Sequence, residues 1–94
     1  MATMTEQCPD LLEMAELLKT IGHPLRLRIM ARLADRCCCV RDLWECLQLP
    51  QAIVSQHLKI LKDRGVVVAR REGVKVCYSI KEGLMRDIVR VLMV

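Results

Sequence analysis

Apolar residues recur every three or four positions through much of the first two-thirds of the chain, a spacing that predicts amphipathic helices. The stripes place four expected helices at residues 9–21, 24–34, 39–47 and 51–64. Pro9 and Pro24 suit a first helical turn, where the missing backbone N–H has no partner in any case. Gly22 and Gly65 follow the first and fourth stripes and are typical of helix ends. The region is therefore expected to fold as separate short helices.

The pattern changes to alternation after residue 65. Two runs rich in β-branched residues, within VVVARREGVKVCYSI at residues 66–80, flank Glu72-Gly73, which predicts a hairpin with a two-residue turn. The second run alternates apolar and polar residues, so one face of the hairpin is expected to be apolar and the other solvated. The expected apolar set is Val74, Val76, Tyr78 and Ile80, and the solvated set is Lys75, Cys77 and Ser79.

A final segment, residues 82–93, is apolar on most sides of a helix. Such a helix needs burial on more than one face. The chain is also 53% hydrophobic, so we expect a second copy to cover part of its apolar surface. The outer helices, residues 9–21 and 82–93, are the expected homodimer interface. A length of 94 residues fits one domain, residues 1–94.

The expected order of elements is α-α-α-α-β-β-α, a mainly α fold with one β-hairpin. Two short helices joined by a tight turn and followed by a basic hairpin are the parts of a winged helix-turn-helix, whose second helix enters the major groove of DNA. The net charge is +4, and residues 51–75 hold the whole excess, which is typical of a nucleic-acid interface. The expected contacts to bases and phosphates are Gln51, Ser55, Gln56, Lys59 and Lys62 on the fourth helix, with Arg70, Arg71 and Lys75 on the hairpin.

Other classes of protein fit the sequence less well. His23 and His57 are the only histidines, neither belongs to a visible nucleophile–base pair, and no phosphate-binding glycine loop occurs. We therefore predict that the chain is not an enzyme. The paired C-x-x-C motifs of a zinc-structured module do not occur either. A winged helix used only for protein interaction stays open as an alternative, although the basic hairpin favours DNA.

The N-terminal residues are acidic, unlike a secretion signal, and no apolar run approaches the ~20 residues of a membrane span. We therefore expect a cytoplasmic protein without a membrane partner, in a compartment where thiols stay reduced. Double-stranded operator DNA and a second copy of the chain are the expected partners, and no cofactor is expected to be required for DNA binding.

Three of the six cysteines stand in a row within DRCCCVRDLW, residues 35–44. Adjacent Cα atoms lie ~3.8 Å apart, below the usual disulfide range of ~4.4–6.8 Å, so the row does not predict a disulfide scaffold. Three neighbours cannot share one helix face, so at least one should be exposed or in a turn. In an extended segment Cys37 and Cys39 would point the same way and form a C-x-C pair, while Cys38 would join them only after a sharp turn.

Two stretches of this chain, GHPLRLRIMARL and CVRDLWECLQLPQAIVSQHLKILKDRGVVVARREGVKVCYSI, make it resemble the ArsR/SmtB family of metal- and thiol-responsive repressors. The resemblance covers roughly residues 14–82, and residues 54–78 are its most specific part. It implies a homodimeric winged-helix repressor that releases DNA when an inducer binds, with the outer helices as the dimer interface. The DNA contacts that it implies are Gln51, Ser55, Gln56 and His57 on the recognition helix, and Arg71 and Lys75 on the wing. For His57, DNA contact and bracing of the helix beside Leu58 stay equally open.

The resemblance also suggests where an inducer binds. Many metal-sensing members of the family carry C-V-C-D-L at the start of the third helix, and its two thiolates bind a soft ion. The matching stretch here is Cys39-Val40-Arg41-Asp42-Leu43, in which an arginine replaces the second cysteine. The thiols that could complete the site are Cys37, Cys38 and the N-terminal Cys8, since some members use an N-terminal cysteine from the partner subunit. Thiolates select arsenite, Cd(II), Pb(II) or Hg(II), and such an ion is the first expectation for the inducer.

Oxidation is the alternative for the same cysteines. Arg36 and Arg41 flank the row near a helix N-terminus, so the pKa of these thiols is expected to be lowered, as in sensors of peroxide or persulfide. Cys46 is expected in the core, and Cys77 on the solvated face of the hairpin as a candidate second switch. The family also has a zinc site of His and carboxylate residues on its last helix, which we predict to be absent because residues 82–94 contain no His.

Overall fold

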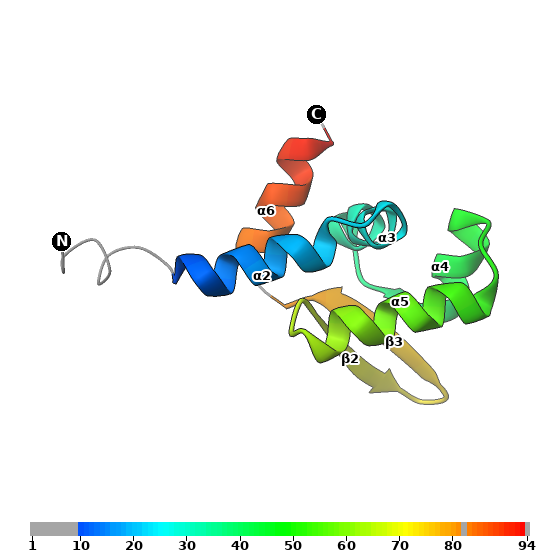
Figure 1. The fold of residues 1–94 in the computed structure, drawn as a ribbon. Helices are drawn as coiled ribbons and strands as arrows, with labels where there is room; N and C mark the ends of the chain where they lie inside the picture. Colours follow the sequence, from blue (N-terminus) through cyan, green and yellow to red (C-terminus); the bar gives the residue numbers. More distant parts are fainter. Residues whose placement is uncertain (1–9, 82, 94) are drawn as a thin grey trace, which may run out of the picture.

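The computed structural model describes residues 10–81 and 83–93, and Figure 1 shows the arrangement of their helices and strands. The predicted order of helices and hairpin is confirmed, with one added strand. In chain order the elements are α2 (Leu11–Ile21), α3 (Pro24–Asp35), β1 (Cys38–Cys39), α4 (Val40–Leu47), α5 (Gln51–Asp63), β2 (Val67–Glu72), β3 (Lys75–Ile80) and α6 (Gly83–Leu92). None of the helices in this described part of the chain is long and apolar enough to cross a membrane.

The sheet is antiparallel and has the strand order β1-β3-β2, so β3 lies in its middle. The sequence pattern does not predict β1, because a strand of two residues is too short to show an alternation. The hairpin register pairs Glu72 with Lys75, so the predicted turn at Glu72-Gly73 is wrong by one residue. Gly73 and Val74 form the turn, with Gly73 at a φ of 65°, a conformation that favours glycine. Val74 is 95% exposed at the tip and does not belong to the apolar face.

Helices α2 and α3 each begin at a side chain whose hydrogen bond replaces a missing helical one. Asp10 caps α2 by accepting from the N–H of Leu12 at 3.0 Å, and the Nδ1 atom of His23 caps α3 by accepting from the N–H of Leu25 at 3.1 Å. Between α4 and α5, Gln48 adopts the left-handed conformation that ends α4. This conformation of Gln48 makes the connection between α4 and α5 tight.

One hydrophobic core joins the helices to one face of the sheet. Every described helix contributes at least one buried side chain to it, and the contribution of the short α4 is the fully buried Leu43. The largest buried side chains are Ile29, Met30, Leu33, Leu43, Leu58, Leu61 and Met85. Because α3 contacts α2, α4, α5 and α6, it is the central element against which the others are positioned.

Three arginines of α3 and α6 fix neighbouring elements through backbone carbonyls. Arg28 donates to the Leu47 carbonyl oxygen at the end of α4 at 2.9 Å, and Arg26 donates to the Thr20 carbonyl oxygen at the end of α2. Arg90 of α6 donates to the Ala34 carbonyl oxygen near the end of α3 at 2.9 Å. These bonds satisfy carbonyl groups that helix ends leave without an intrahelical partner.

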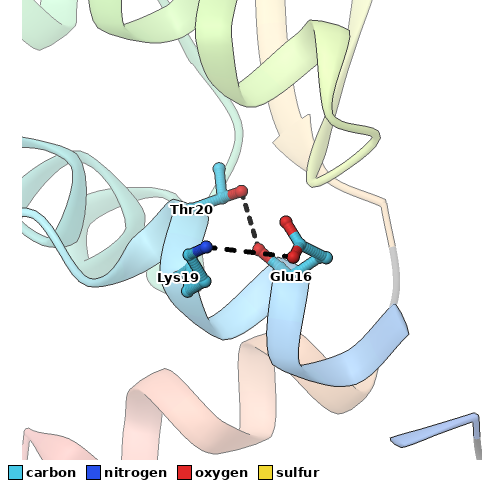
Figure 2. Close-up of polar contacts among 3 residues, drawn as sticks. All are labelled: Glu16, Lys19 and Thr20. Carbon is cyan, nitrogen blue, oxygen red and sulfur yellow. Dashed lines mark hydrogen bonds and ion pairs between the residues drawn. The ribbon is translucent and has the colours of Figure 1, made fainter. Parts of the chain in front are cut away.

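Polar contacts within α2 keep its last turn compact, as Figure 2 shows. The buried Thr20 donates its hydroxyl hydrogen to the Glu16 carbonyl oxygen at 2.9 Å, which satisfies a group that would otherwise be costly to bury. Lys19 lies 3.9 Å from the Glu16 carboxylate on the exposed side. A pair this exposed contributes little stability.

Candidate nucleic-acid interface and thiol cluster

Helix α5 presents one buried and one exposed face. Val54, Leu58 and Leu61 pack into the core, as their helical spacing predicts. The opposite face is exposed and polar, and helix α5 itself lies beside the hairpin of β2 and β3 (Figure 1). The predicted contact residues on this exposed face are Gln51, Ser55, Gln56, Lys59 and Lys62. The face combines amide and hydroxyl groups, which can bond base edges, with cations suited to phosphates.

Lys59 is a cation of this face that already has a partner. Its Nζ atom lies 2.8 Å from Asp63 Oδ2, one turn further along the helix. The hydrogen bond raises the pKa of Lys59 and lowers that of Asp63. Both side chains are exposed, so the ion pair is weak and screened by salt. Lys59 is therefore able to exchange Asp63 for a phosphate group.

His57 is the one predicted contact residue of α5 that is not exposed. Its ring lies 4.7 Å from the ring of His23, the residue that caps α3, with an angle of 43° between the planes. Its Nδ1 atom is buried without a hydrogen-bond partner in the described part of the chain. This position favours bracing of α5 against the start of α3 over contact with DNA. No local pattern predicts the histidine pair, because His23 and His57 are 34 positions apart in the sequence.

The histidine pair gives the fold a dependence on pH. Burial, together with the nearby His23 and Arg26, lowers the pKa of His57 from its ordinary 6.5. The folded state thus favours neutral His57, and this contribution is complete above pH 6.5 and is lost as the pH falls through the lowered pKa. We expect the free energy of unfolding to decrease below that pH with a slope of at most about 1.4 kcal/mol per pH unit from this group.

Urea denaturation of the wild type and of His57→Leu, at several pH values from about 7.5 to about 5, measures this dependence. The wild type should lose more stability than the variant over that range, because leucine has no proton to bind. Equal losses in the two proteins would show that His57 does not cause the effect.

The hairpin carries exposed cations on both of its faces. Arg70 lies opposite Cys77 and its guanidinium is 3.7 Å from Glu72, whereas Arg71 lies opposite Val76 and donates to the Gly73 carbonyl oxygen at 3.4 Å. Consecutive residues of a strand point to opposite faces, so the two arginines face apart. Lys75 begins β3 and is also exposed. The wing can therefore meet a phosphate backbone from either side.

The three consecutive cysteines point in different directions. In the pairing of β1 with β3, Cys38 lies opposite Tyr78 and Cys39 lies opposite Cys77. Directly opposed residues share a face of a sheet, so Cys38 belongs to the core face and Cys39 to the outer face. Cys37 is exposed, as expected for at least one member of the row, while Cys38 and Cys39 are buried. The sequence pattern does not predict the pairing of Cys39 with Cys77, since this pairing depends on β1.

The expected lowering of the thiol pKa is wrong for Cys38. Burial raises its pKa, and this effect outweighs the opposing influence of the Arg32 and Arg36 charges. The pKa of Cys77 is raised to about 11, first because the Glu72 carboxylate accepts a hydrogen bond from the thiol, and then through burial and the Glu72 charge. Both groups are therefore neutral thiols at pH 7.

Two further cysteines differ from expectation in their surroundings. Cys46 was predicted in the core but is exposed, and it lines an open cavity of about 500 Å³ together with Arg32, Arg36, Cys37, Cys38, Asp42 and Glu45. Cys77 lies on the outer face of the hairpin as predicted, yet it is half-buried and lies opposite Cys39 of the neighbouring strand β1. The candidate Cys8 lies outside the described residues. Across residues 10–81 and 83–93, no three His, Cys, Asp or Glu side chains are grouped to hold a metal ion.

Comparison with known proteins identifies the family. A family described as "Bacterial regulatory protein, arsR family" matches residues 23–68, the region from the cap of α3 into β2. The chain is 42% identical over 80 residues to the transcriptional repressor PagR of Bacillus anthracis, covering 83% of this chain and 79% of PagR. It is also 42% identical over 74 residues to the repressor SmtB of Mycobacterium tuberculosis, covering 79% of this chain. The chain spans 55% of the length of that SmtB.

Solved structures agree with this match and confirm the winged-helix fold. The crystal structure of PagR superimposes with a TM-score of 0.82 at 37% identity, covering 87% of this chain and 94% of PagR. A homodimeric winged helix-turn-helix DNA-binding domain from Mycobacterium bovis gives a TM-score of 0.79 at 26% identity, covering 88% of this chain and 77% of that domain. The family consists of regulators, in agreement with the prediction of a protein that is not an enzyme. In sequence and in fold, this chain belongs to the ArsR family of bacterial regulatory proteins.

Proposed function

We propose that this protein is a DNA-binding transcriptional repressor. The observation that carries the proposal is the exposed polar face of α5 beside a hairpin with cations on both faces. The face has the side-chain chemistry for reading base edges, and the hairpin has the charge for holding the backbone. PagR and SmtB, each 42% identical to this chain over the aligned residues, are themselves described as repressors.

We further propose that the protein acts as a homodimer through α2 and α6. Both outer helices expose large apolar side chains, which is unfavourable unless another surface covers them. These side chains are Leu11, Leu12 and Leu18 of α2, and Leu84, Val91 and Leu92 of α6 with the adjacent Met93. In such a dimer the two α5 helices would read half-sites about one DNA turn apart, ~34 Å, on a palindromic operator. The homodimeric relative from Mycobacterium bovis supports this assembly.

Shortening one exposed side chain of α6 tests the interface. Val91 is 73% exposed, and Val91→Ala removes two methyl-sized groups worth ~0.8 kcal/mol each when buried. Because both subunits carry the change, we expect the dimer dissociation constant, measured by analytical ultracentrifugation, to rise roughly a hundredfold. Val74→Ala at the hairpin tip is the matched control, because it makes the same change at an even more exposed site away from the outer helices. Equal effects of the two variants would count against α6 as an interface.

The salt dependence of DNA binding tests the hairpin as a phosphate contact. Lys75→Ala should flatten the plot of log affinity against log salt concentration by about 0.9, because the variant neutralises one phosphate fewer. Lys19→Ala is the matched control, since it removes the same charge from an exposed position on α2 (Figure 2), a helix distant in sequence from the hairpin. A flattened plot for Lys19→Ala as well would mean that total charge, rather than the hairpin, sets the salt dependence.

We propose that the inducer acts on the cysteines of residues 37–39, with Cys8 as an added ligand, and that a soft metal(loid) ion such as arsenite is the first candidate. Cys37 is the exposed thiol by which such an ion would enter. Binding there would move β1 and the start of α4. Since α4 packs against α5, the two recognition helices of the dimer would lose the spacing that the operator requires. Oxidation is the second candidate, favoured by the direct opposition of Cys39 and Cys77.

Operator affinity, measured by fluorescence anisotropy with the DNA upstream of the gene, tests these proposals together. The protein is kept reduced with a non-thiol reductant, and arsenite is then added. A sharp loss of affinity at stoichiometric arsenite would support a metalloid inducer. Tight binding that arsenite leaves unchanged would instead favour oxidants, and the lack of any specific binding would contradict the repressor.

A further inference from the structure

Cys39 and Cys77 occupy the position in a sheet that a disulfide requires. They are directly opposed residues of the antiparallel strands β1 and β3. The Cα atoms of such pairs lie about 4.5–5.5 Å apart, within the ~4.4–6.8 Å range of disulfides, and their side chains share one face. Cys38 faces the core beside Tyr78, and Cys46 lies on the separate cavity beside Arg32. The register therefore singles out one pair among the described cysteines.

We propose that Cys39 and Cys77 form a reversible disulfide that joins the start of α4 to the middle strand of the sheet. The bond would reinforce the short pairing of β1 with β3, which consists of two residue pairs. It would link residues that the sequence separates by 38 positions. Oxidation would thus join two strands of the sheet, whereas the row of three cysteines alone suggests partners within the row.

The chemistry needs a hydroperoxide or a comparable two-electron oxidant. The Cys39 sulfur, as its thiolate, attacks the peroxide oxygen, the O–O bond breaks, and a sulfenic acid and an alcohol or water result. The Cys77 sulfur then displaces the hydroxyl group of this sulfenic acid, which leaves as water as the S–S bond forms. The Cys77 proton passes by way of the Glu72 carboxylate, the acceptor of its hydrogen bond, to the departing hydroxyl group, which completes the water molecule. Two electrons move from the two sulfurs to the peroxide, and a reductant reverses the bond.

The position of the pair explains how the bond could change DNA binding. Cys39 is 9% exposed at a groove of about 800 Å³ whose walls include Gln51 at the start of α5 and Lys75 of the hairpin. These are two of the residues proposed to contact DNA. A covalent bond at the base of this groove would fix the angle between the hairpin and the α4–α5 pair. This regulatory consequence rests on the proposed repressor function, whereas formation of the bond does not.

Peptide mapping of the full chain tests the bond itself. The protein is treated with hydrogen peroxide, free thiols are alkylated, and the monomeric fraction is digested without reduction and analysed by mass spectrometry. We expect a peptide that joins Cys39 to Cys77, absent after treatment with a non-thiol reductant and absent in Cys77→Ser and in Cys77→Ala. Cys46→Ser is the matched control and should keep it. Folding of each variant is checked by circular dichroism. Cross-links confined to other cysteine pairs, or none at all, would overturn the proposal.

Operator affinity of the reduced and oxidised protein tests the switch. We expect oxidation to change the affinity of the wild type and of Cys46→Ser at least fivefold, and to leave that of Cys77→Ser unchanged. A cross-link that forms without any change in affinity would overturn the switch. If neither redox state binds the operator, the proposed repressor function fails, while the peptide map still decides whether the disulfide exists.

Discussion

Alanine at Gln51, Ser55 and Gln56 together should weaken operator binding by about a hundredfold or more. Each good side-chain contact to a base edge contributes ~1–3 kcal/mol of discrimination, and the variant removes three candidates at once. All three side chains are exposed on α5, so the loss should come from the interface rather than from the core. Fluorescence anisotropy with operator DNA at fixed salt concentration measures the effect.

Binding of the same variant to a scrambled duplex provides the control. The three residues are uncharged, so non-specific affinity and its salt dependence should stay close to those of the wild type. The ratio of specific to non-specific affinity should therefore fall. Equal weakening on both duplexes would indicate a folding defect, and unchanged operator affinity would remove this face of α5 from the interface.

Cys39→Ser should leave operator binding intact and abolish release by the inducer. Cys39 directly precedes α4 and lines the groove that contains Gln51 and Lys75, so it is placed to transmit a chemical change to both proposed DNA contacts. Allosteric coupling of ~1–3 kcal/mol is typical, which corresponds to a roughly 5–150-fold loss of affinity in the wild type. In the variant, operator affinity with and without arsenite, or before and after peroxide treatment, should be the same.

Cys46→Ser is the appropriate comparison, because Cys46 is exposed on α4 yet lines the cavity of Cys37 and Cys38 and not the groove of Cys39. It should release DNA like the wild type. Normal release by Cys39→Ser would exclude Cys39 as the sensor. Loss of release in Cys46→Ser instead would move the site to the cavity that Cys37, Cys38 and Cys46 share.

Much of the fold follows from local patterns. The 3.6-residue periodicity located α3 and α5 to within a residue at each end, because their buried stripes are regular and a proline or glycine lies near their ends. The exposed face of α5 followed from the same stripe. The alternation in β3 assigned Tyr78 to the apolar face and Cys77 to the outer face, which the register confirms.

What could not be predicted depends on contacts between distant segments. β1 exists only because β3 pairs with it, and that pairing half-buries Cys77 and sets Cys39 opposite it. The burial of Cys46 is difficult to predict, because a helix as short as α4 does not define the width of its buried face. The buried stripe of α4 runs through Val40, Leu43 and Leu47, and Cys46 falls roughly a quarter turn from its centre, on the side of the exposed cavity.

The hydrogen bond from Arg90 to the Ala34 carbonyl oxygen fixes α6 near the end of α3, where the two helices already pack together. Ala34 lies three residues before Cys37, and Arg90 belongs to the outer helix proposed to meet a second copy. A displacement of the cysteine segment would therefore move α6 at the proposed interface between subunits as well as the DNA-facing helices. In the proposed dimer, the chemical state of one subunit would then influence the response of the other subunit to the inducer. The dimer would therefore respond over a narrower range of inducer concentration than a single chain could.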